Sequence, residues 1–600
     1  MKYIKVNNCI VKDNLVKFHI DSPNSNRTYS NIFLFSGWAF SINKNENVTI
    51  LIEYSNKIVK EPLSVVRNDV VAHFTKNSNS LEPPLKCGFT LSLTKDAKVT
   101  ICCNDTPTIE FTFSIIDSEI KSEWELLEKL NQAHVDNNPE LIDEKALVLL
   151  DNSPYNYVGS NPSDLNDAYW IPNEIKENLI YFIKNARSFD FGPKIIKSAL
   201  ENGVIKIASP LNAKKDAYCD SSFYSAPFNY LRFISKGIAF YIIQHFSFCD
   251  VIYIPKFGVR HFLSPWINKN KWHENITRRS LKANKKKGGF NSVFAAHNRP
   301  YHYNYDIALG LHLLDRNNLL DQIPLLALHE EMCYFRPSRL INSRINESVF
   351  NNADFITHLN QPGFSILAGH QTINTAKEIT YCELFSELDS KLRDNSETLL
   401  DSNIARTICN NLDECSIKLW FGITSQKRKL LNQEEEIAKT INIFAELFDN
   451  VGVVIDGWTS PLKKSEEDLK QIESDSVLAS TIKNLIDADN ISFHSVIGLT
   501  TEEKVVIAKH IDVFLANHGA GSMHIDRIGK IFGVTHNSSI WSAADFAHIH
   551  NNSIKISQIY ISDFEAEDKA QDYVDYSVTP KIIAKEMLKQ YFNSVNKNRI

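Results

Sequence analysis

The sequence predicts an α/β protein in which two doubly wound lobes follow an antiparallel β-sandwich. Residues 1–118 contain short runs of alternating apolar and polar residues, which is the pattern of antiparallel strands. Residues 401–575 alternate short apolar runs with longer helical patterns, which is typical of a parallel sheet covered by helices. Between them, residues 174–400 return to apolar strands and helices, and we predict that they form the first lobe.

The composition is that of an ordinary globular protein. With 600 residues, more than one domain is expected. Hydrophobic residues make up 43% of the chain, and the formal net charge of -6 does not favour a general nucleic-acid role. No apolar run is long enough to cross a bilayer and the first residues do not form a signal peptide, so we expect a cytoplasmic protein or one attached to the membrane from that side. The 10 cysteines lack metal-ligand spacing and receive no role.

The first module holds short strands separated by Asn, Asp, Lys and Pro, for example at 48–52 and 88–93. This pattern favours an antiparallel sandwich. The fragments SGWAF at 36–40 and CGF at 87–89 resemble a small β-module found at the front of bacterial glycan-building transferases. Trp38 either stacks on a sugar or packs in the core, and the core role is the commoner one.

A linker is predicted over residues 119–173, first as an amphipathic helix and then as an irregular segment rich in Asn, Asp and Pro. The most basic stretch of the chain, 278–287, falls in the predicted first lobe. Such a charge run is usually a solvated loop. The alternative is weak contact with an anionic membrane surface, which attracts such a segment by roughly 1 kcal/mol per basic residue.

In the second lobe, strands are predicted at 417–423, 451–455, 491–496 and 511–517. Parallel strands of a doubly wound sheet place their ligand crevice at the carboxyl ends. Polar clusters follow the first and the last of these strands, at 425–432 and 517–522. The final segment, 576–600, has apolar residues at helical spacing and is predicted to be a helix that braces the first lobe.

The cluster His518-Gly519-Ala520-Gly521-Ser522 joins a buried strand to a predicted helix at 523–530. Glycines let the backbone turn sharply and approach a ligand, and Ser522 can cap the helix. Backbone N–H groups at such a turn suit a phosphate or diphosphate. The alternative is a strand-to-helix turn whose glycines serve packing only, because short glycine motifs are weak evidence.

The order of these motifs resembles glycosyltransferase family 61. The resemblance rests on a strand followed by Ser, Arg and Asn, on a later strand that ends in HGAG, and on an upstream His302-Tyr303 pair with Asp306 four residues after the histidine. It implies a GT-B-like pair of Rossmann-type lobes, a nucleotide-sugar donor held by the second lobe, and an inverting transfer without an obligatory metal. Gln426 stands where the family usually has Arg, and Ser522-Met523 replace its Leu-Thr. The family's donor-site residues carry over to Arg428, Asn432, His518, Gly519, Ala520 and Gly521.

Sugar transfer needs a group that stabilises the departing diphosphate and a base for the acceptor hydroxyl. Arg428 suits the first task because a guanidinium binds phosphate with two hydrogen bonds. For the base we prefer Asp306 over His302, with a structural role for Asp306 at the helix start as an equal alternative. Asp456, at a strand end, either binds a ribose or sugar hydroxyl or only shapes the turn, and the turn role is the commoner one.

No cofactor or metal is expected. Asp487-Ala488-Asp489 has the DxD form of metal-dependent transferases. It precedes a strand, on the wrong edge of the sheet for the crevice, so we interpret it as a solvated loop. His536, His548 and His550 follow the glycine-rich turn, but no carboxylate or cysteine completes a metal set.

The sequence therefore predicts a cytoplasmic glycosyltransferase that moves a sugar from a nucleotide-sugar donor to a polysaccharide or lipid-linked glycan. Its partners are expected to be these two substrates and no nucleic acid. One alternative is a non-catalytic glycan-binding protein that keeps a degenerate transferase fold, since fold does not guarantee activity. Another is a different two-lobed enzyme, such as a sugar-nucleotide epimerase or a phosphatase.

Overall fold

A computed structural model gives the structure of the protein. It describes the chain apart from residues 1, 13–15, 23–26, 30–32, 44–45, 55–56, 78–82, 94–95, 118–119, 137–156, 169, 265–266, 268–288, 372–378, 399–401, 428, 541–551, 565–572 and 598–600. Arg428, the basic stretch 278–287, His548 and His550 therefore lie outside the described residues.

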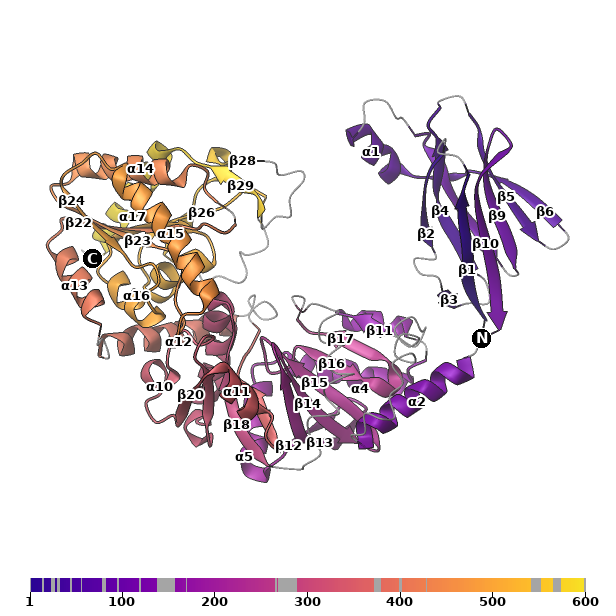
Figure 1. Ribbon diagram of the computed structural model, residues 1–600, viewed down its shortest axis with the longest axis horizontal. Helices are drawn as coiled ribbons and strands as arrows, with labels where there is room; N and C mark the ends of the chain where they lie inside the picture. The colour runs from indigo at the N-terminus through magenta and orange to yellow at the C-terminus, as the bar shows by residue number, and fades with distance from the viewer. Residues whose placement is uncertain are drawn as a thin grey trace. The chain divides into compact units, whose positions relative to one another are not determined.

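The protein is mixed α/β, as the sequence predicts (Figure 1). It divides into two compact units. The first comprises Met1–Val158 with Asp167–Trp170 and Ile254–Arg260, and the second comprises Gly159–Asn166, Ile171–Tyr253 and His261–Ile600. The chain passes between the units near two short strands, β11 (Tyr157–Gly159) and β17 (Val259–Phe262).

The first unit contains two antiparallel sheets that share one core. One sheet has the order β3-β1-β10-β9-β5-β6 and the other β2-β4-β8-β7. Side chains from both sheets, among them Phe35, Ile50, Phe89 and Val99, belong to the same buried cluster. Alternation along each strand produces this core, because successive side chains point to opposite faces. The elements are β1 (Lys2–Val11), β2 (Val16–Ser22), β3 (Arg27–Tyr29), β4 (Phe33–Ser41), β5 (Val48–Tyr54), β6 (Lys57–Pro62), β7 (Val65–Val66), α1 (Asn68–Asn77), β8 (Lys86–Leu93), β9 (Ala97–Cys103), β10 (Thr106–Asp117) and α2 (Ile120–Asp136).

Trp38, the residue for which the sequence left a sugar contact open, is half-buried on β4. Its ring centroid lies 5.8 Å from that of Phe40 and 5.7 Å from that of Phe74. Phe40 is itself part of a small buried cluster with Val70 and Cys87. The indole therefore has a packing role between β4 and α1.

The second unit begins with an antiparallel sheet in which β16, β15, β14, β13 and β12 are neighbours in that order. These strands span Val251–Ile254, Ile238–Gln244, Phe228–Ser235, Asn212–Ser225 and Ile205–Ser209. The hairpin between β14 and β15 turns at Lys236 and Gly237, both with positive φ (50° and 72°), as a tight hairpin turn requires. Helices α4 (Asn173–Ala186) and α5 (Phe191–Asn202) precede the sheet. The first lobe thus includes an antiparallel sheet that a Rossmann-type lobe would lack.

A parallel sheet follows, with the order β20-β19-β18-β21. Its strands are β18 (Phe290–Ala295), β19 (Leu326–His329), β20 (Glu347–Phe350) and β21 (Phe364–Leu367). The connection from β18 to β19 runs through α8 (Pro300–His302), the π-helix η4 (Tyr303–Ile307) and α9 (Ala308–Arg316). The remaining helices of this part are α10 (Pro337–Leu340) and α11 (Asn352–Leu359). Helix α12 (Ile379–Thr398) then leads toward the second lobe and packs against elements of both lobes.

The second lobe is built on a parallel sheet with the order β24-β23-β22-β25-β26-β27. The predicted strands are confirmed as β22 (Ile417–Gly422), β23 (Val451–Asp456), β24 (Ile491–Ser495) and β25 (Val513–Asn517). Strands β23 and β24 are added on one side of β22, and β25 to β27 are added on its other side. The strand order therefore reverses between β22 and β25, and such sheets bind their ligands at this switch point. The two polar clusters flank this switch point. The last strands are β26 (Gly533–His536), β27 (Ser553–Lys555), β28 (Ser562–Phe564) and β29 (Asp575–Ser577).

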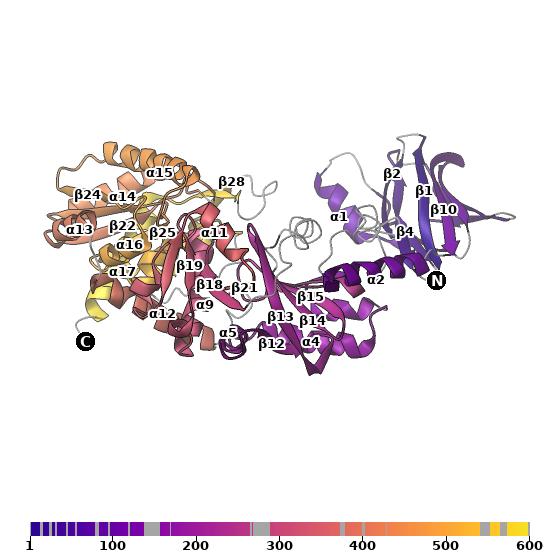
Figure 2. The ribbon, with the colours of Figure 1, turned by 60° about the horizontal axis from the view of Figure 1, so that its bottom comes forward.

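Helices cover both faces of this sheet (Figure 2). On one face, α14 (Gln433–Leu447), α15 (Glu466–Asn484) and α17 (Pro580–Lys597) contribute to one buried cluster. On the other, α13 (Asn403–Asp413) and α16 (Thr501–Ala508) contribute to a second. Because Ile583 and Met587 of α17 lie in the first of these clusters, the terminal helix packs on the second lobe, and the prediction that it braces the first lobe is wrong. No helix among the described residues is long and apolar enough to cross a membrane.

Candidate active site

His302 and Asp306, which lie four residues apart, form a hydrogen-bonded pair. His302 Nδ1 lies 2.8 Å from Asp306 Oδ2. His302 directly precedes the π-helix Tyr303–Ile307 and Asp306 lies within it, and residues four apart lie on the same face of a helix. The helix begins at Pro300, after a short loop (296–299) that follows the carboxyl end of β18, and proline's fixed φ suits the first helical position.

The two members of the pair differ in exposure. The Asp306 side chain is only 3% exposed, whereas that of His302 is 23% exposed. The backbone carbonyl of Asp306 also accepts a bond from His370 N (2.8 Å), which fixes the helix to the segment after β21. Asp306 is therefore the anchored partner, and His302 is the partner that solvent or a substrate can reach.

Two further histidines surround His302, and the sequence did not single them out. The His297 ring centroid lies 4.7 Å from that of His302 and 5.1 Å from that of His245. Phe246 completes the group, with its ring centroid 4.5 Å from that of His302. Burial lowers the pKa of His245 to about 4 and that of His297 well below its usual value. Both rings are therefore neutral at pH 7 and add no positive charge beside His302.

A buried carboxylate shapes the loop that carries His245. Asp250 Oδ2 accepts bonds from the backbone N–H groups of His245, Phe246 and Ser247 at 2.6, 2.8 and 2.9 Å. Its Oδ1 accepts a bond from Ser247 Oγ (2.8 Å). Burial raises the pKa of Asp250 to about 6, and these bonds oppose the rise. The loop is thus held by one side chain, which fixes His245 and Phe246 beside His302.

In the second lobe, the glycine-rich turn directly follows β25. Gly519 has φ of 115°, a conformation that side chains with a Cβ rarely adopt. His518 N donates to His536 O (2.9 Å), and His518 Nδ1 lies 3.1 Å from Thr535 Oγ1, so the histidine is tied to β26. Ser522 Oγ donates to Gly519 O (3.1 Å) and makes no capping bond. The prediction that Ser522 caps the next helix is therefore wrong, because its hydroxyl closes the turn instead.

The segment after this turn also differs in type from the predicted helix at 523–530. It forms a 3-10 turn, η7 (Ala520–Ser522), and then a π-helix, η8 (Met523–Ile528). A π-helix thus occurs both at the His302–Asp306 pair and after the glycine-rich turn. π-Helical turns are rare in proteins, and those that occur are often found at functional sites.

Tyr576 of β29 joins the two polar clusters of the second lobe. Its hydroxyl lies 2.6 Å from His536 Nδ1 and accepts a bond from Asn517 Nδ2 (3.2 Å). Its carbonyl accepts a bond from Leu431 N (2.7 Å), and its N–H donates to Lys429 O (3.1 Å). The chain directly after Arg428 is therefore held by Tyr576, whose hydroxyl also contacts the last residue of the strand that leads into the glycine-rich turn.

Asn432 and Asp456 have structural partners of their own. Asn432 has a left-handed conformation (φ 52°) at the start of α14 and makes no side-chain cap, a conformation that asparagine tolerates better than most residues. Asp456 forms a buried ion pair with Lys504, with Nζ 2.6 Å from Oδ1. Lys504 Nζ also donates to Gly457 O and Thr459 Oγ1 (3.0 and 2.9 Å). Asp456 thus holds the turn after β23 through Lys504, in line with the turn role that the sequence left open.

Sequence reasoning missed two polar residues at the same edge of the sheet. Asn537 and Ser538 come directly after β26 and are both fully buried. Asn537 Oδ1 and Nδ2 and Ser538 Oγ have no hydrogen-bond partner among the described residues. Asn517, the last residue of β25, pairs with His536, the last residue of β26. Asn537 and Ser538 therefore follow β26 at the same level at which the glycine-rich turn follows β25. A buried amide without partners is costly, so such groups mark a place where a ligand can bind.

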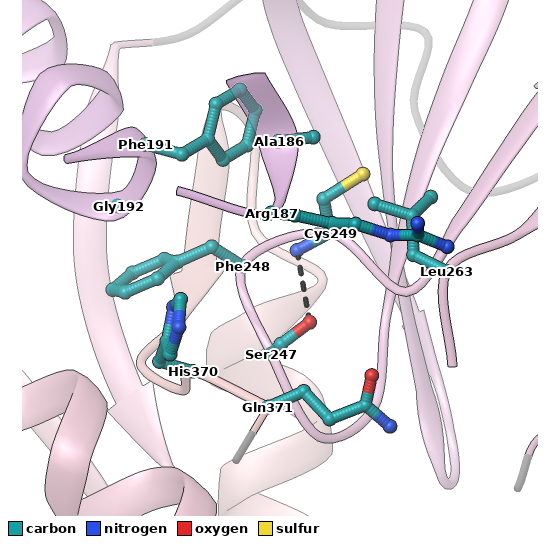
Figure 3. A pocket seen from close by; sticks show the side chains of 10 residues that line it. All are labelled: Ala186, Arg187, Phe191, Gly192, Ser247, Phe248, Cys249, Leu263, His370 and Gln371. Carbon is teal, nitrogen blue, oxygen red and sulfur yellow. Dashed lines mark hydrogen bonds between the residues drawn. The ribbon is translucent and has the colours of Figure 1, made fainter. Parts of the chain in front are cut away.

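Figure 3 shows a small cavity in the first lobe, beside the loop that Asp250 holds. Its volume is about 10 Å³, which is about the space of one water molecule. It is too small for a sugar or a nucleotide. The side chains that line it are Ala186, Arg187, Phe191, Gly192, Ser247, Phe248, Cys249, Leu263, His370 and Gln371.

The acidic residues of the DxD sequence, Asp487 and Asp489, are exposed in the loop before β24. Within the described part of the chain, no group of three His, Cys, Asp or Glu side chains has an arrangement that could hold a metal ion. His536, the described member of the three late histidines, is hydrogen-bonded to Tyr576.

Two contacts bring the helix of His302 against the second lobe. Arg299 Nη1 donates to Gln426 Oε1 (3.5 Å), in the turn after β22. Arg527 Nη2 of the second π-helix donates to Asn304 O (3.3 Å). The helix that carries the pair therefore contacts the first polar cluster of the second lobe and the π-helix that follows the second cluster.

No protein-family model and no curated protein matches the chain in sequence. Among solved structures, E. coli ADP-heptose lps heptosyltransferase II is similar over 50% of this chain and 99% of its own length, with 10% identity and a TM-score of 0.31. The glycosyl transferase family 9 protein from Veillonella parvula DSM 2008 matches over 51% and 99%, with 11% identity and a TM-score of 0.29. The glycotransferase of kitacinnamycin matches over 47% and 71%, with 10% identity and a TM-score of 0.18. Likenesses as loose as these support no conclusion about the activity of this chain.

Proposed function

We propose that the chain is a glycosyltransferase that moves a sugar from a nucleotide-sugar donor to a hydroxyl of a polysaccharide or lipid-linked glycan. One observation carries the proposal. A hydrogen-bonded histidine–carboxylate pair lies on a helix that contacts the second lobe, whose sheet carries a glycine-rich turn at its switch point and buried polar groups after the next strand. The first is a device for removing a proton, and the second is suited to a diphosphate.

In this proposal His302 is the base and Asp306 its orienting partner, the reverse of the preference drawn from the sequence. Asp306 Oδ2 accepts a bond from the Nδ1–H of His302, which leaves the lone pair on Nε2. The more exposed member of the pair then meets the acceptor. The buried carboxylate holds the ring in this tautomer and stabilises the imidazolium that forms, as in other histidine–carboxylate pairs.

The reaction is a single displacement with inversion. His302 Nε2 takes the proton of the acceptor hydroxyl while the acceptor oxygen forms a bond to the anomeric carbon. The bond from that carbon to the diphosphate oxygen breaks, and the nucleoside diphosphate leaves with the electron pair. The backbone N–H groups of the turn at 519–521, with His518 and Arg428, would stabilise its charge.

The buried amide of Asn537 and the hydroxyl of Ser538 would bind hydroxyl groups of the donor, because they have no partners among the described residues. Asn432 would order the loop of Arg428. We further propose that the lobes have a GT-B-like arrangement, that the first module is a β-sandwich accessory to the transferase, and that the reaction takes place in the cytoplasm. The basic stretch 278–287 would contact the anionic membrane surface near a lipid-linked acceptor.

The proposal is tested by the thermal stabilisation of the purified protein in a panel of nucleoside diphosphates and nucleotide sugars. A ligand that binds only the folded state raises Tm. We expect one nucleotide class to raise Tm, and we expect Asn537→Ala to reduce that shift. His302→Ala is the matched control and should retain it, because the base does not bind the donor. If no nucleotide raises Tm while a glycan does, the chain is a glycan-binding protein instead.

A second arm separates transfer from other nucleotide-sugar chemistry. With the donor identified, we expect turnover only when a glycan acceptor is present, and we expect Asp306→Asn to slow it, because the wrong histidine tautomer becomes favoured. Interconversion of the free nucleotide sugar without an acceptor would indicate an epimerase. Full activity of Asp306→Asn would remove Asp306 from the mechanism.

A further inference from the structure

A buried arginine joins the two halves of the candidate site. Arg527 lies on η8, directly after the glycine-rich turn, and is 2% exposed. Its Nε donates to Asp389 Oδ1 on α12 (3.1 Å), and its Nη2 donates to Asn304 O (3.3 Å). Asn304 lies between His302 and Asp306 on the first π-helix. One side chain of the second lobe is thus bonded to the main chain of the helix that carries the proposed base.

Aromatic rings enclose the same guanidinium group. Its central carbon lies 4.2 Å from the ring centroid of Tyr305 and 4.8 Å from that of Phe385, distances at which a cation is attracted by a ring face. Tyr305 stacks in turn on Tyr301, with 4.4 Å between the ring centroids. Arg527 therefore contacts the π-helix through both its main chain and a side chain, and contacts α12 through an acid and a ring.

The energetic cost of this arrangement points to a role in geometry. Asp389 is 2% exposed, and burial raises its pKa to about 6 although Arg527 acts to lower it. Burying two charges costs more free energy than packing apolar side chains of similar volume, so a buried ion pair is weak evidence for stability. Fixed donor directions and a planar cation do, however, define one relative placement of the groups that they join.

The π-helix is also fixed within its own lobe. His370 N donates to Asp306 O (2.8 Å). In α9, a Cβ added to Gly310 would lie 2.3 Å from Gly369 N, so this helix and the segment after β21 are in close contact. Elsewhere, Leu462 N donates to Cys333 O (2.8 Å), which is another bond between the lobes. The helix is therefore held from both sides.

We infer that Arg527 and Asp389 are positioning residues that hold the His302–Asp306 helix at a fixed place relative to the glycine-rich turn, so that the two halves of the site are assembled before any substrate binds. The catalytic consequence of this inference rests on the proposed function, whereas the geometric consequence does not. A site assembled in advance spends less binding energy on bringing its groups together.

The test uses hydrogen exchange measured by mass spectrometry on the full chain without substrate. Arg527→Met alone leaves Asp389 buried and unpaired, so the informative variant is Arg527→Met/Asp389→Leu, which removes both charges. Lys463→Gln is the matched control. It removes the ion pair between Lys463 Nζ and Glu330 Oε1 (2.5 Å), which also joins the lobes but does not touch the π-helix.

In the double variant we expect the amides of 303–307 to exchange at least about tenfold faster than in the parent, while Tm stays within a few degrees. Lys463→Gln should leave exchange at 303–307 unchanged. With the donor identified, the double variant should lower kcat about tenfold and leave the donor KM within about twofold, because the glycine-rich turn is intact. A purely structural role would not separate kcat from KM.

Unchanged exchange at 303–307 in a folded double variant would overturn the inference. If the double variant does not fold, Arg527→Lys replaces it, because lysine keeps the charge for Asp389 but cannot also reach Asn304 O. Faster exchange at 303–307 would then support the inference, and parent-like exchange would overturn it. If the parent protein transfers no sugar, the proposed function fails, whereas the exchange measurement still decides whether Arg527 holds the helix.

Discussion

The two halves of the candidate site are built in different ways. In the first lobe the site is made of side chains, with the His302–Asp306 pair set among the rings of His245, Phe246 and His297. In the second lobe the site is made mainly of main chain, and Gly519 has a positive φ, which residues with a Cβ rarely adopt. The side chain of His518 is bonded to Thr535 of β26, and that of Ser522 is bonded to Gly519 within the turn. A half made of side chains should fail when a side chain is removed, whereas a half made of main chain should fail when one is added.

The largest effect is expected from His302→Ala. Loss of a general base slows a reaction by about 10²- to 10⁴-fold, so kcat for transfer should fall by that factor. Donor affinity should not change, because the glycine-rich turn is untouched. Steady-state kinetics and the Tm shift with donor measure the two quantities separately. A variant that keeps more than a tenth of the parent kcat would place the base elsewhere.

Acid should destabilise both halves through their buried histidines. Burial lowers the pKa of His245 and of His536 to about 4, whereas the unfolded value is about 6.5. The unfolded state therefore binds more protons between these values. The contribution of each neutral histidine to the free energy of unfolding is fully present above pH 6.5. It is lost as the pH falls toward 4, by about 1.4 kcal/mol per pH unit for each histidine.

Denaturant unfolding of the parent and of His536→Gln at several pH values measures this loss. The variant should show a shallower decline in the free energy of unfolding between pH 6.5 and 4, since one titrating group is absent. His245 lies in the other lobe but has a similarly lowered pKa. His245→Gln should therefore make the decline in the free energy of unfolding shallower by a similar amount. Parallel curves for parent and variants would contradict the expectation.

A smaller effect is expected from Gly519→Ala. A Cβ at φ of 115° costs about 1–3 kcal/mol of strain, which the turn relieves by moving away from its ligand-binding shape. Donor affinity should fall about tenfold or more, while kcat at saturating donor changes less. Ala520→Gly, the matched change in the opposite direction, should have little effect. Equal donor affinity in parent and Gly519→Ala would show that the turn does not bind the diphosphate.

The smallest effect on the free protein is expected from Asn537→Ala. The amide makes no hydrogen bond to a described residue, so its removal should leave Tm unchanged or slightly raised. Donor affinity should nevertheless fall, by about 1–3 kcal/mol if the amide binds a donor hydroxyl. Calorimetric titration together with a thermal melt measures both. A fall in Tm with unchanged affinity would make Asn537 a structural residue.

Local pattern determined much of the second lobe. Strands predicted at 417–423, 451–455, 491–496 and 511–517 were found with slightly different ends, and the glycine-rich turn was also predicted, because the spacing of apolar residues and glycine's backbone freedom act within a few residues. The i, i+4 spacing of His302 and Asp306 likewise predicted their contact, since the bond lies within one helix. These are features that a short stretch of chain decides by itself.

Only the tertiary structure decided which residues surround these features. Arg527 and Asn304 meet across 223 positions of the chain, and neither sequence neighbourhood shows a sign of the other. The same holds for the His245–His297 contact and for the Asp456–Lys504 ion pair. Likewise, the terminal helix was predictable from its periodicity, but its packing on the second lobe was not. Periodicity states which face of an element is apolar, whereas the partner of that face depends on how distant segments pack together.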